Sequence, residues 1–495
     1  MSTSEYSYGA ALPRRIPAAR RAGSVTLALL LLLVVGSWIA VADGLTRPAK
    51  SVETLVGSDA LLYEPFLGGL VFAAATFPLV LLHAWQVGAS KREGLLLWFV
   101  LCTVAYAKDF AYLQVPQTPL YVTDIVLAVL MFSTFIWPRL RWVSLRSPLM
   151  LGLLAFLVLG VVALIRGILS GSEVTRSFRD FSMVVYPAFV LIGLHMLVSW
   201  ESLQRVGQML IMGALMASLN GVAWFVAQPG LRRYIAFGIW IAVALVGLVV
   251  MMLKRLLPTA LGVPLAFLLV LGLMVSNART LYVVLGIAGL LFLLAGRNLG
   301  RVNKKALIKV LAVVTIAIVA TVTFLTQTKA GQDYVARESE QLVSGVARAE
   351  DDDNAQFRLL AWGEAMLRFI DQPVLGEGFG IPFTFELADS DPRPHNTYLT
   401  VLYKMGLTGI LPLLFSLGYV LRKSAQVLRR HAEDPKVYML HVLLLSQIML
   451  CSYGVLNLLL ESPFLASLFW LNLGMCWRAA LLLRRNHAAE ARVAA

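Results

Sequence analysis

The stretch Pro392–Gly409, PRPHNTYLTVLYKMGLTG, places a histidine directly before an apolar run that is suited to enter a membrane. Two prolines stiffen the approach to His395, and Asn396 or Thr397 stands where a helix cap belongs. Such a cap side chain satisfies amide groups that are free at the start of a helix. The sequence therefore predicts a membrane helix that starts near Asn396 and has a histidine at its entrance.

The composition of the whole chain fits this prediction. Of the 495 residues, 59% are hydrophobic and only 14% are charged, which is too apolar for a soluble domain. Apolar runs near the ~20 residues that cross a bilayer predict an all-α polytopic membrane protein with about 14 transmembrane helices. The expected spans begin near Ser24, Tyr63, Gly94, Leu120, Pro148, Phe181, Val206, Tyr234, Leu257, Thr280, Ala306, Asn396, Val437 and Pro463.

The distribution of charge predicts the orientation. An even number of spans puts both termini on one side, and if that side is the cytoplasm, more than half of the 42 lysines and arginines lie in inner segments. The net charge of +14 then reflects basic cytoplasmic segments, and nucleic acid is not expected as a partner. The first apolar run has no A-x-A-like cleavage site and is interpreted as a retained helix. We expect a cytoplasmic N-terminal segment at 1–23, a bundle of about 11 helices at 24–326, an extracytoplasmic loop at 327–395, further transmembrane helices at 396–485 and a cytoplasmic tail at 486–495.

The segment 327–395 differs from the rest of the chain. It contains no spanning run and holds nearly half of the 28 acidic residues. Within it, FRLLAWGEAMLRFI (Phe357–Ile370) has apolar residues at helical spacing, so short amphipathic helices on the membrane face are expected. The run Asp351–Asp353 is interpreted as solvated charge, because three consecutive carboxylates do not converge on one ion unless the backbone bends sharply. No metal site or cofactor is predicted, and the three cysteines, all in apolar runs, give no sign of a disulfide.

Several arginines lie in segments that the topology places outside, where the positive-inside rule does not explain them. Each could pair with an outer carboxylate or reach lipid headgroups, or it could bind a phosphate through its planar guanidinium. Arg279 is the sharpest case, because its outer connection is very short. Arg176 and Arg179 share a face if their segment is helical, and Asp180 is expected to pair with one of them. The full set is Arg166, Arg176, Arg179, Arg232, Arg233, Arg279 and Arg358.

Among the histidines, His195 and His441 are interpreted as packing residues, whereas His395 stands at a helix entrance. A neutral imidazole there is suited to accept a proton from a sugar hydroxyl. Asp124 and Glu461 lie near outer helix ends, where each either orients an arginine or meets water. Lys404 lies inside its helix and is expected to extend outward along it.

PHNTYLTVLYKMGLTGILPLL, preceded by FRLLAWGEAMLRFIDQPVLGEGFG, resembles the shared region of the O-antigen ligases and O-antigen polymerases. The similarity is strongest from about Arg279 to Gly409 and includes the arginine of SNART, the His-Asn pair at 395–396, and the stretch from Arg358 to Gly376. YVTDIVLAVL near Asp124 resembles a weaker pattern of the family's first half.

The resemblance implies a GT-C-like inverting, metal-independent glycosyltransferase of the bacterial inner membrane. Its donor would be a glycan linked to a polyprenyl diphosphate, usually undecaprenyl diphosphate, and its acceptor either another glycan or the lipid A core. His395 would be the catalytic residue and would activate the acceptor hydroxyl. Arg279 would bind the diphosphate with help from an earlier outer arginine, Arg179 in preference to Arg176, Arg232 or Arg233. Arg358 and Asn396 complete the implied substrate-binding set.

Two other classes of protein remain as alternatives. A transporter or flippase normally places ionisable groups at mid-membrane and often shows inverted repeats, whereas the candidate charges here gather at the outer face. The other alternative is a non-catalytic scaffold subunit, and only the family resemblance argues against it.

Overall fold

The computed structural model describes residues 18–46, 67–114, 118, 120–135, 147–227, 238–276, 279–296, short stretches between 312 and 336, 353–383 and 393–494. In these residues the chain is helical, and the one strand-like contact is an isolated bridge between Gln114 and Tyr121. The helices are α1 (Ala18–Thr46), α2 (Leu67–Gln86), α3 (Lys91–Tyr106), α4 (Lys108–Ala111), α5 (Val122–Phe135), α6 (Pro148–Leu169), α7 (Val174–Val185), α8 (Ala188–His195), α9 (Trp200–Ala227), α10 (Gly238–Leu253), α11 (Thr259–Val275), α12 (Arg279–Gly296), α15 (Asp353–Asp371), α16 (Thr397–Arg430), α17 (Val437–Leu456) and α18 (Pro463–Ala494).

This arrangement confirms a multi-pass helical membrane protein. Eight helices of the described part are long and apolar enough to cross a bilayer, with α7 and α8 together forming one of them, and four shorter apolar helices accompany them. A helix lies at each span expected from the sequence except the one from Ala306, most of which falls outside the described residues. The expected total of 14 therefore remains a prediction.

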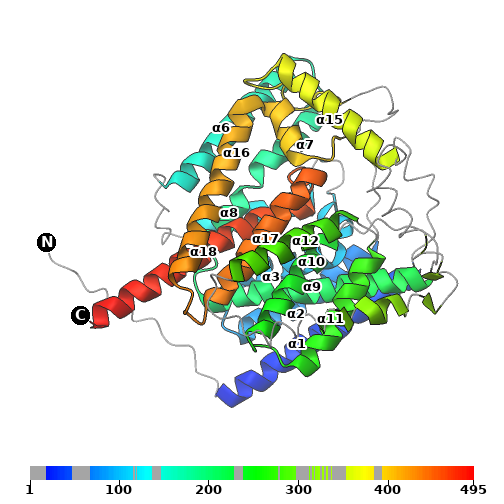
Figure 1. Ribbon diagram of the computed structural model, residues 1–495, viewed down its shortest axis with the longest axis vertical. Helices are drawn as coiled ribbons and strands as arrows, with labels where there is room; N and C mark the ends of the chain where they lie inside the picture. The colour runs from blue at the N-terminus through cyan, green and yellow to red at the C-terminus, as the bar shows by residue number, and fades with distance from the viewer. Residues whose placement is uncertain are drawn as a thin grey trace.

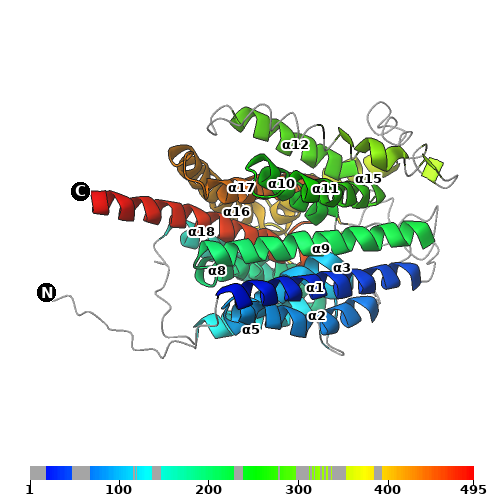
Figure 2. The same ribbon diagram turned by 90° about the horizontal axis from the view of Figure 1, so that it is seen from below.

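Side-chain contacts define two ends of the bundle. At one end, Arg205 of α9 pairs with Glu93 of α3, and Lys436 lies over the ring of Trp200. At the other end, α6 finishes and α7, α16 and α18 begin, and we call this the site end. The first described residues of α1 and the last of α18 lie on the same side of the molecule, on the left in Figure 2, whereas α15 lies toward the opposite side (Figures 1 and 2).

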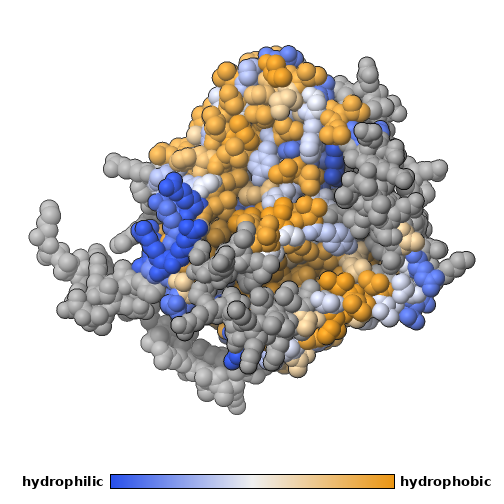
Figure 3. Space-filling view, in the orientation of Figure 1, coloured by the Kyte–Doolittle hydropathy of each residue, from blue (hydrophilic) through white to orange (hydrophobic). Residues whose placement is uncertain are grey.

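The surface between the two ends is apolar. Figure 3 shows hydrophobic side chains over α6 and α16, where large residues are exposed although both helices pack against each other. Charged groups are nearly absent from this belt because an unpaired charge facing hydrocarbon is unfavourable. The exposed members include Leu151, Leu154, Val158, Ile165, Leu411 and Leu414.

A break in α16 makes room for the loop that follows α15. Gly406 has φ 64° and ψ −162°, a conformation that is essentially restricted to glycine, within an otherwise continuous helix. A Cβ at this position would lie 2.3 Å from the carbonyl oxygen of Val374. The amides of Leu407 and Thr408 instead donate to the carbonyls of Pro373 and Val374, at 2.8 and 3.1 Å. The irregular segment after α15 is thus held against α16 through main-chain hydrogen bonds.

Candidate active site

The amphipathic helix predicted within Phe357–Ile370 is confirmed as part of α15, and it forms one wall of the histidine turn. Trp362 of α15 donates its indole N–H to the carbonyl oxygen of Pro394 at 2.7 Å. The ring of Phe357 lies edge-on to the ring of His395, with centroids 6.4 Å apart. Two side chains of α15 therefore fix the turn from the outside.

His395 itself has an unusual backbone, with φ at 49°. The left-handed region is uncommon for a residue with a side chain, although histidine visits it more often than most residues do. Burial, followed by the positive charges of Arg358, Lys108 and Arg393, lowers the pKa of His395 to about 4. At neutral pH the imidazole is uncharged and has an available lone pair.

The start of α16 is capped as the sequence predicts. The side-chain oxygen of Asn396 accepts hydrogen bonds from the amides of Tyr398 and Leu399, both at 3.1 Å. The Thr397 hydroxyl donates to the carbonyl of Asn457 at 3.1 Å and accepts from the amide of Leu459 at 2.7 Å. The loop between α17 and α18 is thereby held beside the histidine turn.

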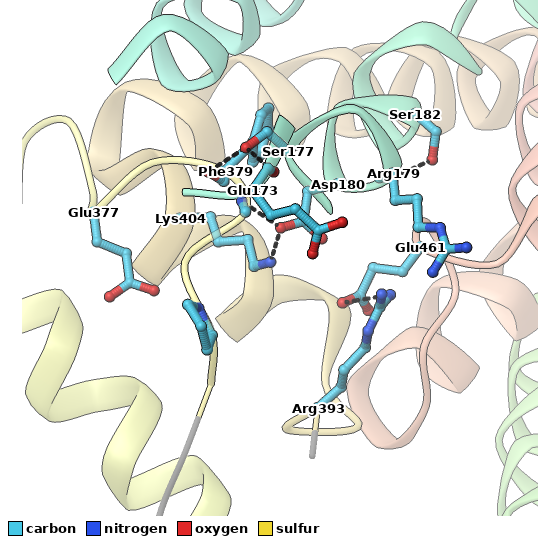
Figure 4. Close-up of polar contacts among 12 residues, drawn as sticks. Glu173, Ser177, Arg179, Asp180, Ser182, Glu377, Phe379, Arg393, Lys404 and Glu461 are labelled. Carbon is cyan, nitrogen blue, oxygen red and sulfur yellow. Dashed lines mark hydrogen bonds and ion pairs between the residues drawn. The ribbon is translucent and has the colours of Figure 1, made fainter. Parts of the chain in front are cut away.

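A buried ion pair lies beneath the same turn (Figure 4). The ammonium group of Lys404 pairs with Oδ2 of Asp180, which also accepts the amide N–H of Gly380 at 2.8 Å. The predicted pairing of Asp180 with Arg176 or Arg179 is therefore wrong, as is the outward course expected for Lys404. Both side chains are buried, so each charge needs the other as a partner.

A second charged group fixes the loop after α15. Arg368 donates to Glu364 at 2.7 Å, lies 3.4 Å from Glu377, and donates to the carbonyl of Pro382 at 2.9 Å. Its guanidinium also lies over the ring of Phe383, 4.9 Å from the centroid. This arginine is fully engaged and acts as a clamp.

A third charged group, Arg393 with Glu461, has a longer separation between its charges. Nη1 of Arg393 lies 3.7 Å from Oε1 of Glu461. Burial lowers the pKa of Arg393, but the opposing charges of Glu461 and Asp180 outweigh it, so the net pKa is above the ordinary value. Burial raises the pKa of Glu461, and the charges of Arg393 and Lys404 counteract this only in part. Of the two outer carboxylates singled out in the sequence, Glu461 orients an arginine, whereas Asp124 accepts hydrogen bonds from Tyr186 and the amide of Tyr121.

The structure describes the side chains of some predicted substrate-binding arginines but not of others. Arg279 is the first residue of α12, but its side chain lies outside the described residues, as do Arg232 and Arg233. Arg176 and Arg179 are on α7, and Arg179 extends toward the loop that carries Glu461 (Figure 4), with a buried Nε that has no hydrogen-bond partner in the described part of the chain. Arg358 lies on α15 and acts on His395 through its charge. Arg166 donates to Gln372 at 2.6 Å, so its partner is a side-chain amide and not the outer carboxylate or lipid headgroup considered for it.

No group of three or more histidine, cysteine, aspartate or glutamate side chains in the described segments is placed to hold a metal ion. Asp351 and Asp352 of the acidic run lie outside those segments. The three cysteines are free thiols, in agreement with the sequence.

Comparison with known proteins finds one family that matches part of this chain. A family model described as O-antigen ligase matches residues 264–414, from α11 to the middle of α16. Over residues 264–414 the chain is similar to the O-antigen ligase family. The matched region contains His395, Asn396, Arg279 and Arg358, and it confirms the resemblance found in the sequence. No curated protein matches the chain. The chain is thus a multi-pass membrane protein with a segment similar to the O-antigen ligases, and this similarity supports enzymatic activity in general.

The sequence did not single out Arg393 or the side chains of α15 that contact the histidine turn. Arg393 stands two residues before His395, and that proximity was the available signal. Trp362 and Phe357 lie in the predicted amphipathic helix, but nothing in their spacing shows which face meets the turn.

Proposed function

We propose that the chain transfers a glycan from a polyprenyl diphosphate, undecaprenyl diphosphate in the simplest case, to an acceptor hydroxyl at the outer face of the bacterial inner membrane. Both termini are then cytoplasmic, and the acceptor is either the lipid A core or another glycan. The observation that carries this proposal is the uncharged His395, held in a strained turn among cationic side chains at the site end.

His395 takes the proton from the acceptor hydroxyl as the acceptor oxygen attacks the anomeric carbon. The bond between that carbon and the diphosphate oxygen breaks, and the diphosphate departs as an anion. Attack from the face opposite the leaving group inverts the anomeric centre. Because a diphosphate is already a good leaving group, the chain needs to neutralise its charge more than to protonate it.

Arginines supply that neutralisation in the proposal, with Arg279 as the principal ligand and Arg179 in support. Guanidinium groups stay protonated and bind phosphate oxygens in pairs, so no divalent metal is required. The gathering of charged groups at one end of the bundle also favours an enzyme at a membrane surface over a transporter, whose ionisable groups are normally at mid-membrane.

The test is transfer by the purified protein from an undecaprenyl-diphosphate-linked glycan. Arg279→Ala is expected to weaken donor binding as well as turnover, and Arg279→Lys to restore little, because one ammonium cannot reproduce two parallel hydrogen bonds. Transfer in EDTA should match transfer without it. Complete loss in EDTA, restored by Mg²⁺ or Mn²⁺, would refute the metal-independent mechanism.

A further inference from the structure

The Arg393–Glu461 pair is incomplete in a way that the other charged groups are not. The Glu461 side chain is 1% exposed, and neither carboxylate oxygen has a hydrogen-bond partner of good geometry in the described part of the chain. The Thr400 hydroxyl lies near enough to lower the pKa of Glu461, but it donates to the carbonyl of Asn396 at 3.1 Å. The 3.7 Å separation from Arg393 Nη1 is too long for a hydrogen bond. A buried carboxylate without hydrogen bonds is unfavourable, so this contact is the weakest charged pairing at the site end.

The long distance between Arg393 and Glu461 is not explained by poorly held neighbours. Arg393 precedes Pro394, whose carbonyl is held by Trp362, and Glu461 follows a loop that is held twice by Thr397. The two groups are thus fixed near each other by neighbours on both sides. Their failure to form a close hydrogen-bonded pair is a property of the site.

The chemistry of the two groups indicates what completes them. A guanidinium binds phosphate oxygens through two parallel hydrogen bonds, which the present contact with Glu461 does not provide. The Arg393 side chain is 30% exposed, so an anion can approach it, whereas Glu461 is closed to solvent. Arg393 also lies two residues from His395 and contributes to the positive potential around it.

We propose that Arg393 is a diphosphate-binding residue of the donor site and that Glu461 is its counter-ion in the empty state, displaced when the diphosphate binds. This inference rests on the proposed function, because it assigns a further ligand to the same donor. Glu461 keeps Arg393 in place and partly neutralises it between turnovers. Glu461 also lowers the affinity of the site for diphosphate, which assists release of the polyprenyl diphosphate product.

The experiment measures binding of inorganic pyrophosphate to the purified full-length protein in nanodiscs at one fixed ionic strength. Arg393→Gln should weaken binding about tenfold or more, the usual effect of losing a charge-assisted hydrogen bond. Glu461→Gln should tighten binding about threefold or more, since the competing carboxylate is gone. The double variant Arg393→Gln/Glu461→Gln should bind as weakly as Arg393→Gln, because Glu461 acts through Arg393.

Glu377→Gln is the matched control, since Glu377 is a half-buried carboxylate that lies beside Arg368 instead of Arg393. If Glu377→Gln and Glu461→Gln tighten pyrophosphate binding equally, the effect comes from net charge and the inference is overturned. Weaker or unchanged pyrophosphate binding in Glu461→Gln would also overturn it.

Arginine modification by phenylglyoxal tests the wild-type protein without any substitution, and it decides the matter if a variant does not fold. Pyrophosphate should protect Arg393 but not Arg166, which donates to Gln372. Equal labelling of Arg393 with and without pyrophosphate would contradict the inference. If pyrophosphate binding depends on Arg279 and Arg179 but not on Arg393, this inference fails alone. If the wild-type protein binds no pyrophosphate, the proposed donor fails with it.

Discussion

Two buried carboxylates at the site end, Asp180 and Glu461, differ in how fully their charge is paired and hydrogen-bonded. Asp180 accepts from an ammonium group and a backbone amide on one oxygen, and its partners come from α16 and the loop after α15. Glu461 has one arginine at 3.7 Å and no hydrogen bond in the described part of the chain. The first arrangement is what a stable fold requires of buried charge, and the second is what a binding site tolerates until a ligand arrives.

This difference divides the site end into a structural layer and a reactive layer. The Asp180–Lys404 pair, Gly406 and the loop after α15 form the structural layer, which lies between α6, α7 and α16. His395, Arg393 and Glu461, near the entrance of α16, form the reactive layer. Substitutions in the first layer should act on stability, and those in the second on transfer or binding.

The largest expected effect belongs to the reactive layer. His395→Ala should reduce the transfer rate by about 10² to 10⁴ while leaving binding of the donor largely intact, because the imidazole acts on the acceptor's proton. The measurement is single-turnover transfer by purified protein, with donor binding followed separately. His195→Ala is the control, since His195 is half-buried at the other end of the bundle. Transfer by His395→Ala at a near wild-type rate would remove the general-base assignment.

The structural layer is tested next. Lys404→Met should lower the free energy of unfolding by about 3–5 kcal/mol, because it leaves the buried carboxylate of Asp180 without its cation. The double variant Asp180→Asn/Lys404→Met should recover much of that loss, since it removes both charges. Unfolding by SDS in mixed micelles provides the measurement. A loss below about 1 kcal/mol in Lys404→Met would place this pair with the weak contacts and erase the distinction between the layers.

A smaller loss of stability is expected at the break in α16. Gly406→Ala should cost about 1–3 kcal/mol, because the backbone conformation is unsuited to a side chain and the new Cβ meets the carbonyl of Val374. Gly418→Ala in the same helix is the control, since a Cβ there meets nothing within 4 Å and should stabilise the helix slightly. Equal effects of the two substitutions in the same unfolding assay would show that the break is not required to seat the loop.

Much of this architecture is predictable from sequence because the bilayer imposes a simple rule on apolar length. The spans, the cap at Asn396 and the helix at Phe357–Ile370 all follow from local patterns of a few turns. The O-antigen ligase resemblance also rests on a contiguous motif around His395.

The pairing of buried charges does not follow from such patterns. Asp180 and Lys404 are 224 positions apart, and their meeting depends on the break at Gly406 and on the loop that fills it. A sequence pattern places a charge on a helix but does not identify its partner, which is why the nearer Arg176 and Arg179 were the expected choices. No sequence pattern distinguishes Arg393 either, since its significance lies in an incomplete contact with Glu461.

The smallest expected effect concerns pH and separates His395 from an ordinary histidine. Its pKa of about 4 means that the imidazole remains an uncharged base throughout the neutral range, so the transfer rate should change less than about twofold between pH 6 and 8. Activity should fall only as the pH drops toward 4, because protonation then removes the lone pair.

Arg358→Gln removes one cause of the depressed pKa of His395, so the variant should begin to lose activity at a higher pH than the wild type. The ratio of rates at pH 5.5 and 7.5 measures this shift independently of any change in donor binding. Arg166→Gln, which removes a positive charge that does not act on His395, should leave the ratio unchanged. A wild-type rate that halves near pH 6.5 would show that His395 titrates as an exposed histidine does, and the reactive layer would then lack the uncharged base that distinguishes it from the structural layer beneath.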